Sequence, residues 1–316
     1  MKILINPGTS KNIITIIALG EDYYANWYKH SYPCLQKYCK NHKLGLIVFD
    51  KDLISKDSKL WKKATWQKLL IAETLKNSSL LVENICNLDA DILVNHNAPN
   101  IFDKYDPNTI GLVSMINNLP FSLTEAQRKV SFLRHRYYDK KYPLDSSILA
   151  NLEQRFTSNN LPPQKDYACS GVVIFNVKNH ANLMRSWFEK YDSNKLTLSS
   201  GEQQLSDPIF NYEFQKWGKI SWLDYKFQAL WNFEMAIKYP FLYKLKKDND
   251  NLIRECIEAS LMTNYFLHFA GLWYESDMFE IGGVLGSEEK KSEIEDYYRY
   301  LATPVSGVGK GVIKPS

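Results

Sequence analysis

The stretch NLDADILV, residues 87–94, decides how this sequence folds. Its two acids, Asp89 and Asp91, stand one residue apart between apolar runs, and alternate side chains of extended backbone point the same way. Two such oxygen donors can hold Mg²⁺ or Mn²⁺ and leave positions open for phosphate oxygens. Without a cation, charges placed side by side repel. A solvated turn is the alternative, but the apolar flanks favour a buried metal site at the end of a strand.

Strands and helices are expected to alternate ahead of this stretch. Apolar runs predict strands, and helical spacing predicts helices, at 13–19 (strand), 23–41 (helix interrupted at Pro33), 44–49 (strand), 59–76 (helix) and 85–88 (strand). This order is typical of a doubly wound α/β sheet, whose ligands bind at the carboxyl ends of the strands. Asp50 and Asp89 each close a strand, so both are expected at that edge.

The rest of the chain predicts further elements around the same sheet. We expect strands at 112–115, 170–176 and 266–269, helices from 176 to about 191, at 203–217 and at 251–263, and irregular aromatic backbone at 221–233. Residues 117–165, rich in Asn, Pro, Arg and Tyr, are expected to be an insertion with some helix. The sequence therefore predicts an α/β fold with a mixed, mainly parallel sheet flanked by helices. Residues 1–281 would form a single domain, and 282–316 a tail that is partly helical or disordered.

Composition narrows the function classes. The 316 residues, 45% hydrophobic, suffice for one sizeable core. A formal charge of +4 without a concentrated basic stripe argues against nucleic-acid binding. It is compatible with a polyanionic nucleotide or with weak peripheral contact with an anionic membrane. Five cysteines without a CxxC pair argue against a disulfide framework and for a reducing compartment. No apolar leader or membrane-spanning run is found, so a cytoplasmic protein, soluble or peripheral at the membrane, is expected.

Several motifs together resemble a known enzyme class. LDADILVN at 88–95, preceded by a helix with Trp66 and Lys68, is followed by SGVVIFN at 170–176, GEQQLSD at 201–207 and LHFAG at 267–271. In this order they resemble GT-A fold glycosyltransferases, nearest to the glycogenin and lipopolysaccharide galactosyltransferase-like group (family 8-like), over roughly residues 13–275. LDADILVN is the strongest motif, and the others are individually weak. The resemblance implies a hexosyltransferase with a Rossmann-like nucleotide-sugar domain. It would move a sugar from a nucleotide-diphosphate sugar, most simply a UDP-sugar, to a glycan, glycolipid or protein acceptor, as in polysaccharide biosynthesis.

The same resemblance implies which residues meet the donor nucleotide. Ala18, Leu19 and Gly20, after the first strand, would cradle the base and ribose. Asp50 would accept a hydrogen bond from the base or ribose, and its alternative is a plain strand-end cap. Lys68 would lie toward the phosphates, and its alternative is an exposed helix lysine.

A metal set follows from the resemblance as well. Asp91 would be the main ligand of Mn²⁺ or Mg²⁺, with Asp89 on the metal or the ribose, and His268 would complete the site. Gly271 would let the backbone approach the diphosphate closely. The family commonly has a phosphate-binding Lys directly after this glycine, whereas here LWY follows. The alternative for His268 is a satisfied core histidine.

The donor sugar would face three short segments. Glu202 would hydrogen-bond the sugar hydroxyls, and Gln203 would sit beneath the anomeric carbon, so that both are catalytic candidates together with Asp91. Ser170 and Gly171 would form a small-residue turn that admits the sugar or the acceptor. Helix N-terminal chemistry is the alternative for Glu202, and an ordinary strand entry for the Ser-Gly pair. No base for inverting transfer is identified. The positions of Gln203 and His268 resemble the retaining branch, so the resemblance implies transfer with retention.

Other functions stay open. The basic residues of the insertion, Arg128, Arg134, His135 and Arg136, are expected on the acceptor side, with a solvated helix face as the alternative. Haloacid-dehalogenase-like phosphatases also use a DxD, but after their first strand, whereas here it follows the third predicted strand. A nucleotidyltransferase would need a Gly-rich basic loop near the first strand, which ALGEDYYANW (18–27) lacks. A nucleotide-sugar-binding module without turnover is the non-enzymatic alternative.

Overall fold

The computed structural model describes residues 1–138, 149–191, 206–245, 249–271 and 274–282. Residues 1–283 form one compact unit. Glu202, Gln203 and nearly all of the tail expected from 282 onward lie outside the described residues.

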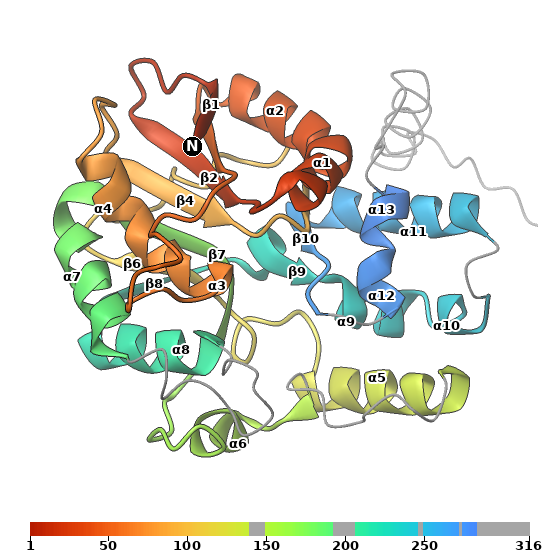
Figure 1. Cartoon of the computed structure of the whole chain (residues 1–316). Coiled ribbons are helices and arrows are strands. Elements are labelled where there is room, and N and C mark those ends of the chain that lie inside the picture. Colours follow the sequence, from red (N-terminus) through yellow and green to blue (C-terminus); the bar gives the residue numbers. More distant parts are fainter. Residues whose placement is uncertain (139–148, 192–205, 246–248, 272–273, 283–316) are drawn as a thin grey trace, which may run out of the picture. The chain divides into compact units, whose positions relative to one another are not determined.

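The main sheet has seven strands in the order β1-β3-β2-β4-β7-β6-β8 (Figure 1). Their bounds are β1 Lys2–Ile5, β2 Asn12–Ile17, β3 Gly45–Phe49, β4 Asn84–Leu88, β6 Ile110–Ser114, β7 Ala168–Asn176 and β8 Ile220–Leu223. Only β1 and β7 run against their neighbours, so the sheet is mixed but mainly parallel. The expected fold class is confirmed. The sequence pattern predicts neither of the two edge strands, β1 and β8.

Helices flank this sheet. They are α1 Glu21–His30, α2 Tyr32–Asn41, α3 Ala64–Gln67, η1 Lys68–Leu70, α4 Ile71–Lys76, α5 Leu123–Tyr137, α6 Leu152–Thr157, α7 Val177–Lys190, α8 Ser206–Trp217, η3 Tyr225–Gln228, α9 Trp231–Lys238, α10 Leu242–Leu245, α11 Asp250–Thr263, α12 Tyr274–Asp277 and α13 Phe279–Gly282. The expected break near Pro33 is confirmed, because this proline sits in the first turn of α2. The helix expected at 59–76 is wrong in its first part, since helical backbone begins only at Ala64.

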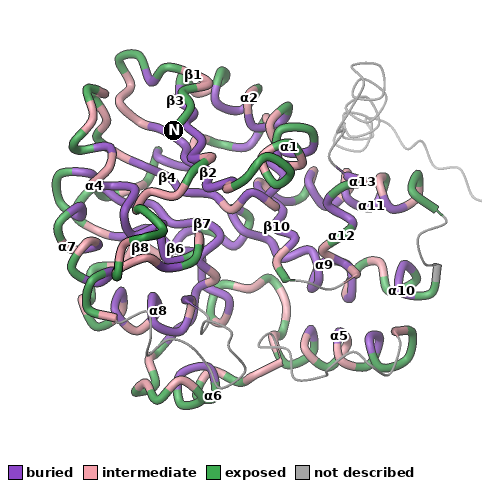
Figure 2. The backbone as a smooth tube through the Cα atoms, in the orientation of Figure 1, coloured by how far each residue is buried: buried purple, intermediate pink, exposed green. Residues whose placement is uncertain are grey.

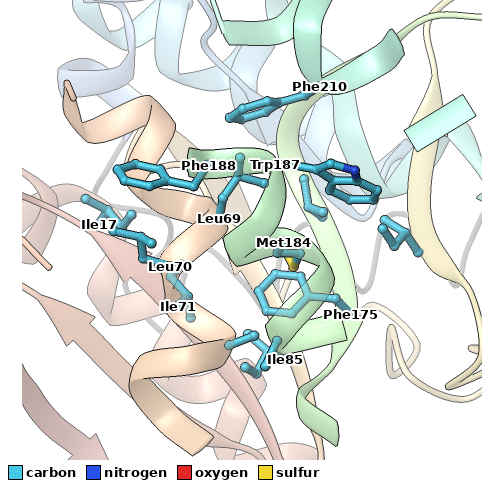
Figure 3. Close-up of a cluster of buried hydrophobic side chains, with 14 of the residues drawn as sticks. Ile17, Leu69, Leu70, Ile71, Ile85, Phe175, Met184, Trp187, Phe188 and Phe210 are labelled. Carbon is cyan, nitrogen blue, oxygen red and sulfur yellow. The ribbon is translucent and has the colours of Figure 1, made fainter. Parts of the chain in front are cut away.

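One face of the sheet carries an extensive apolar cluster. Side chains from the strands meet those of the α3–α4 segment, α7 and α8, among them Leu69, Phe175, Met184 and Phe210 (Figure 3). Figure 2 shows the strands between the two edges, β3, β2, β4, β7 and β6, buried along most of their length, whereas edge strands β1 and β8 are more exposed. Because successive strand residues point to opposite faces, the nearly continuous burial of β2 and β3 indicates that the other face is covered as well. Helix α2 contributes Leu35 and Tyr38 to the buried set.

A second, three-stranded sheet brings distant segments together beside the first. It consists of β5 Ile92–Val94, β10 Phe266–His268 and β9 Ala229–Leu230, in the order β5-β10-β9. The antiparallel register sets His268 opposite Ile92, and the parallel register sets it opposite Leu230. The irregular backbone expected at 221–233 is therefore wrong: the segment holds most of β8, then η3, β9 and the start of α9.

The described residues of the insertion include two capped helices, α5 and α6. Ser122 accepts a hydrogen bond from the Glu125 amide at the start of α5, and Asn151 and Gln154 form a capping box on α6. Arg134 points inward and pairs with buried Glu275 at 2.9 Å, so its expected place on an acceptor surface is wrong. No helix among the described residues is long and apolar enough to cross a bilayer.

Buried His180 predicts a pH-dependent stability. Its Nδ1 accepts the Asn176 amide, and burial lowers its pKa to about 4 from an ordinary 6.5. The unfolded chain therefore binds more protons between these two pH values, and stability present above pH 6.5 is lost as the pH falls toward 4. This histidine should account for about 3 kcal/mol of that loss. His180→Asn, which keeps an acceptor, should flatten the dependence of the unfolding free energy on pH, measured by urea denaturation. An unchanged slope would contradict the prediction.

Candidate functional site

Three backbone junctions place the two aspartates and His268. Asp89 follows β4 directly, Asp91 precedes β5 directly, and His268 is the last residue of β10. The Asp89 amide donates to the Gly171 carbonyl at 2.9 Å, and the Phe269 amide donates to the Asp91 carbonyl at 3.0 Å. The carboxyl end of β4, the start of β7 and the small sheet therefore fix these backbones together.

The side chains converge. His268 Nε2 lies 3.2 Å from Asp91 Oδ1 and 3.9 Å from Asp89 Oδ2. One ligand atom from each of the three residues lies within 4.8 Å of the others. The expectation that the two carboxylates stand together is confirmed, and His268 joins them.

Electrostatics within the cluster are strongly coupled. Burial and the charge of Asp91 raise the pKa of Asp89, although Lys68 opposes them. Burial pushes the pKa of Asp91 up as well, but His268 and smaller favourable contributions, Lys68 among them, together outweigh burial and leave this pKa lowered. Burial lowers the pKa of His268, but the interactions with Asp91 and Cys169 together outweigh it and hold this pKa well above 6.5. Without a metal, the positive charges of Lys68 and His268 therefore stand next to the acid pair.

The donor set fits a divalent cation. Two carboxylates and an imidazole are ligand types that Mn²⁺ accepts, and Mg²⁺ shares the preference for the carboxylate oxygens. Asp91 Oδ1 is buried, and despite its short distance to His268 it has no well-aligned hydrogen-bond donor within the described part of the chain. A buried carboxylate oxygen without such a donor is costly unless something else binds it. A cation would satisfy that oxygen.

Lys68 occupies the other side of Asp89. Its ammonium lies 2.6 Å from Asp89 Oδ1 and donates to the Ser170 carbonyl at 2.8 Å. The Ser170 hydroxyl in turn donates to Asp207. Although burial opposes its charge, the acids around Lys68 raise its pKa. The alternative of an exposed helix lysine is wrong, since Lys68 is only 5% exposed.

Gly171 is required by close packing. A Cβ added here would lie 2.3 Å from His268 Cε1 and 2.7 Å from Gln228 Nε2. Both distances are far below contact range, so any side chain at this position would displace the histidine. Ser170 and Gly171 lie within strand β7, so the expected turn is wrong, and Gly171 forms a wall of the metal cluster.

The expected nucleotide edge lies at the ends of β2 and β3. The Ala18 amide donates to the Phe49 carbonyl at 2.9 Å, and the Gly20 amide donates to the Asp50 carbonyl at 3.3 Å. Gly20 has φ +90, which glycine adopts without strain. Partly buried Leu19 lies between them and packs against the main apolar cluster.

The Asp50 side chain already has partners. Lys2 lies 3.1 Å from Asp50 Oδ2, and the amino group of Met1 lies 3.2 Å from Oδ1. Burial pushes the pKa of Asp50 up, but these cations outweigh it and lower the pKa. Asp50 is therefore more than a plain strand-end cap, and a ligand hydrogen-bonding to it would compete with Lys2.

Two residues near the cluster escaped sequence reasoning. Tyr23 is 51% exposed as a residue, but the surroundings of its hydroxyl exclude enough water to raise the hydroxyl pKa, and the charges of Asp91 and Asp89 raise it further. Its position in the first turn of α1, after the first central strand, is a signal that could have identified it. Gln228 contacts His268 and has no local sequence signal.

Gly271 lies beyond the cluster with φ +109.

Comparisons with solved structures return glycosyltransferases at low similarity. A glycosyltransferase involved in glycosylation of the major capsid of PBCV-1 is 12% identical, with a TM-score of 0.47 over 85% of this chain and 99% of the other. The galactosyltransferase LgtC, solved with donor and acceptor sugar analogs, is 13% identical, with a TM-score of 0.45 over 89% and 100%. For the bifunctional WbbM, the values are 14% and 0.46 over 93% and 53%. No family model and no curated protein matches the sequence.

The Lys68–Asp89 pair predicts opposite effects with and without metal. Lys68→Met should destabilise the metal-free protein by about 2–3 kcal/mol, because it leaves a partly buried carboxylate without its counter-charge. Mn²⁺ should then raise the melting temperature more in the variant than in the wild type, since the ammonium no longer competes for Asp89.

Differential scanning fluorimetry in EDTA and in Mn²⁺ measures both effects. Lys76→Met, on the exposed side of α4, is the matched control. Equal stability of Lys68→Met and wild type in EDTA would show that Lys68 is not the counter-charge of the acid pair.

Proposed function

We propose that this chain is a metal-dependent glycosyltransferase. It would transfer a sugar from a nucleotide-diphosphate sugar, a UDP-sugar in the simplest case, to a glycan, lipid-linked or protein acceptor. One observation carries the proposal: Asp89, Asp91 and His268 direct ligand atoms to one point at the carboxyl end of the central strands. Ligands of open α/β sheets bind at this edge. The resemblance of LDADILVN to GT-A motifs supports the same reading.

Asp89, Asp91 and His268 would hold Mn²⁺ or Mg²⁺. The bound cation supplies Lewis-acid neutralisation of the charge that develops on the leaving nucleoside diphosphate. Buried Lys68, at Asp89, adds a fixed positive charge beside the ligands. That charge offers one replacement for the phosphate-binding lysine that this sequence lacks after Gly271.

The remaining donor contacts follow from the chain around the cluster. The backbone of Ala18, Leu19 and Gly20, with Asp50, would hold the base and ribose at the ends of β2 and β3. Ser170 and Gly171 would bound the sugar beside His268, where the chain leaves no room for a side chain. Gly271, at positive φ, would let the backbone approach the diphosphate.

Transfer is proposed to occur with retention. Glu202 and Gln203 would face the donor sugar by resemblance, with an amide rather than a base beneath the anomeric carbon. Carboxylate and amide oxygens near this carbon would stabilise an oxocarbenium-like transition state. The anomeric configuration of the product, measured by NMR once an acceptor is found, tests this part separately.

Two alternative functions predict different assay results. A silent binding module would bind a nucleotide sugar without releasing nucleoside diphosphate under any acceptor. A DxD phosphatase would release phosphate from a simple aryl phosphate. Incubation with Mn²⁺ and a panel of nucleotide sugars, followed by assay of nucleoside diphosphate, separates the proposed enzyme from both.

Asp91→Asn should abolish metal-dependent stabilisation by the donor. The substitution removes the charge of the main ligand while the backbone bond from Phe269 to residue 91 remains, so the fold should persist. A thermal-shift panel of nucleotide sugars with and without Mn²⁺ measures the effect, with exposed Asp57→Asn as control. Undiminished Mn²⁺-dependent donor binding by Asp91→Asn would rule out the proposed metal site.

A further inference from the structure

The second ring nitrogen of His268 has its own buried partner. While Nε2 faces Asp91, Nδ1 lies 3.1 Å from the Gln228 side-chain amide and 3.7 Å from Cys169 Sγ. Gln228 is only 2% exposed. It ends η3 directly before β9, whose Leu230 is paired with His268. The small sheet that positions the histidine therefore positions Gln228 as well.

The contact between Gln228 and His268 is tightly enclosed. Gly171 sits against both side chains, and a Cβ there would come within 2.7 Å of either. Gln228 Oε1 is buried and has no hydrogen-bond partner among the described residues. The oxygen and nitrogen ends of a side-chain amide are close in size, so exchanging them by half a turn changes the hydrogen bonds far more than the packing.

The choice between those two ends matters for a metal. A neutral imidazole carries one proton, and a nitrogen that binds a metal must offer its lone pair. If Nε2 binds the cation, Nδ1 must carry the proton and needs an acceptor. The amide end that faces Nδ1 in this structure is a donor, and neither a positively charged imidazole nor the metal-binding tautomer, both protonated at Nδ1, can accept from it. Since amide ends and ring tautomers are assigned from their surroundings, both orientations are accessible.

We propose that Gln228 is a positioning residue of the metal site. By turning its amide, Gln228 presents Oε1 to the Nδ1 proton and so fixes the tautomer that offers Nε2 to the cation. Partners of this kind orient metal-binding histidines in many proteins. The inference rests on the proposed function, because it requires that the cluster bind a cation.

Two near-isosteric substitutions separate orientation from packing. Gln228→Met keeps the length of the side chain but removes the acceptor, whereas Gln228→Glu keeps an acceptor and removes the donor. If Gln228 orients His268, the Met variant should bind Mn²⁺ about 10- to 100-fold more weakly. The Glu variant should bind Mn²⁺ at least as tightly as the wild type. A packing role predicts the reverse order, because Met suits a buried apolar contact and Glu does not.

The measurement is titration of the whole chain with Mn²⁺ alone, followed by electron paramagnetic resonance of the free ion. Cys169→Ala should stay within about twofold of the wild type, since a thiol is a weak partner for Nδ1. Thermal unfolding in EDTA checks that each variant is folded. Loss of affinity in Cys169→Ala with wild-type affinity in Gln228→Met would overturn the assignment.

A direct readout comes from ¹⁵N-labelled histidine. With diamagnetic Mg²⁺, His268 should shift to the form protonated at Nδ1 in the wild type and in Gln228→Glu, but not in Gln228→Met at the same concentration. A wild type that binds neither Mn²⁺ nor Mg²⁺ defeats the proposed metal site. A wild type that binds, together with a Gln228→Met variant that binds equally well, defeats this inference alone.

Discussion

Repulsion between Asp89 and Asp91 governs the arrangement of this part of the molecule. Two carboxylates, each with less than a third of its side chain exposed, stand within reach of a single ion. Such a pair is tolerable only if positive charge is brought to it. Lys68 and His268 supply that charge from opposite sides, one from the helical segment before β4 and the other from the end of β10. The fold around the site is largely the means of delivering these two groups.

The position of His268 depends on backbone features, namely the register of a strand pair and a glycine. His268 reaches Asp91 because the antiparallel register of β5 and β10 sets it opposite Ile92. It fits there only because residue 171 is glycine, whose backbone carbonyl also receives the Asp89 amide. Position 171 therefore links the main sheet, through β7, to the small sheet. A substitution there would disturb both the histidine and the turn that holds the acid pair.

The sequence predicts those parts of the fold and of the site whose pattern is confined to neighbouring residues, and it misses those that depend on contacts between distant segments. The central strands were found because their apolar runs are buried on both faces, and the acid pair because it ends such a run. The segment 221–233 was misjudged because its strands are short: β9, with two residues, owes its existence to pairing with β10 and has no pattern to detect. The burial of Lys68 was missed for a related reason. Its partner Asp89 is close in space, but nothing in a helical pattern indicates that a lysine faces inward.

His268 shows where local sequence patterns stop being informative and the three-dimensional pairing of strands is needed. Alone in an aromatic segment it looks like a core histidine, and it is in fact buried. Only the strand register, a non-local property, turns that core position into a ligand position. In the proposed reaction, a cation held by Asp89, Asp91 and His268 would take over the role that the charge of His268 now has beside Asp91. A diphosphate would then restore negative charge next to Lys68. In the metal-free site, Lys68 and His268 largely balance the charges of Asp89 and Asp91, so an added cation meets little net negative charge. A bound diphosphate would supply that negative charge, and the cation would neutralise the diphosphate in turn. Each therefore favours the binding of the other on electrostatic grounds.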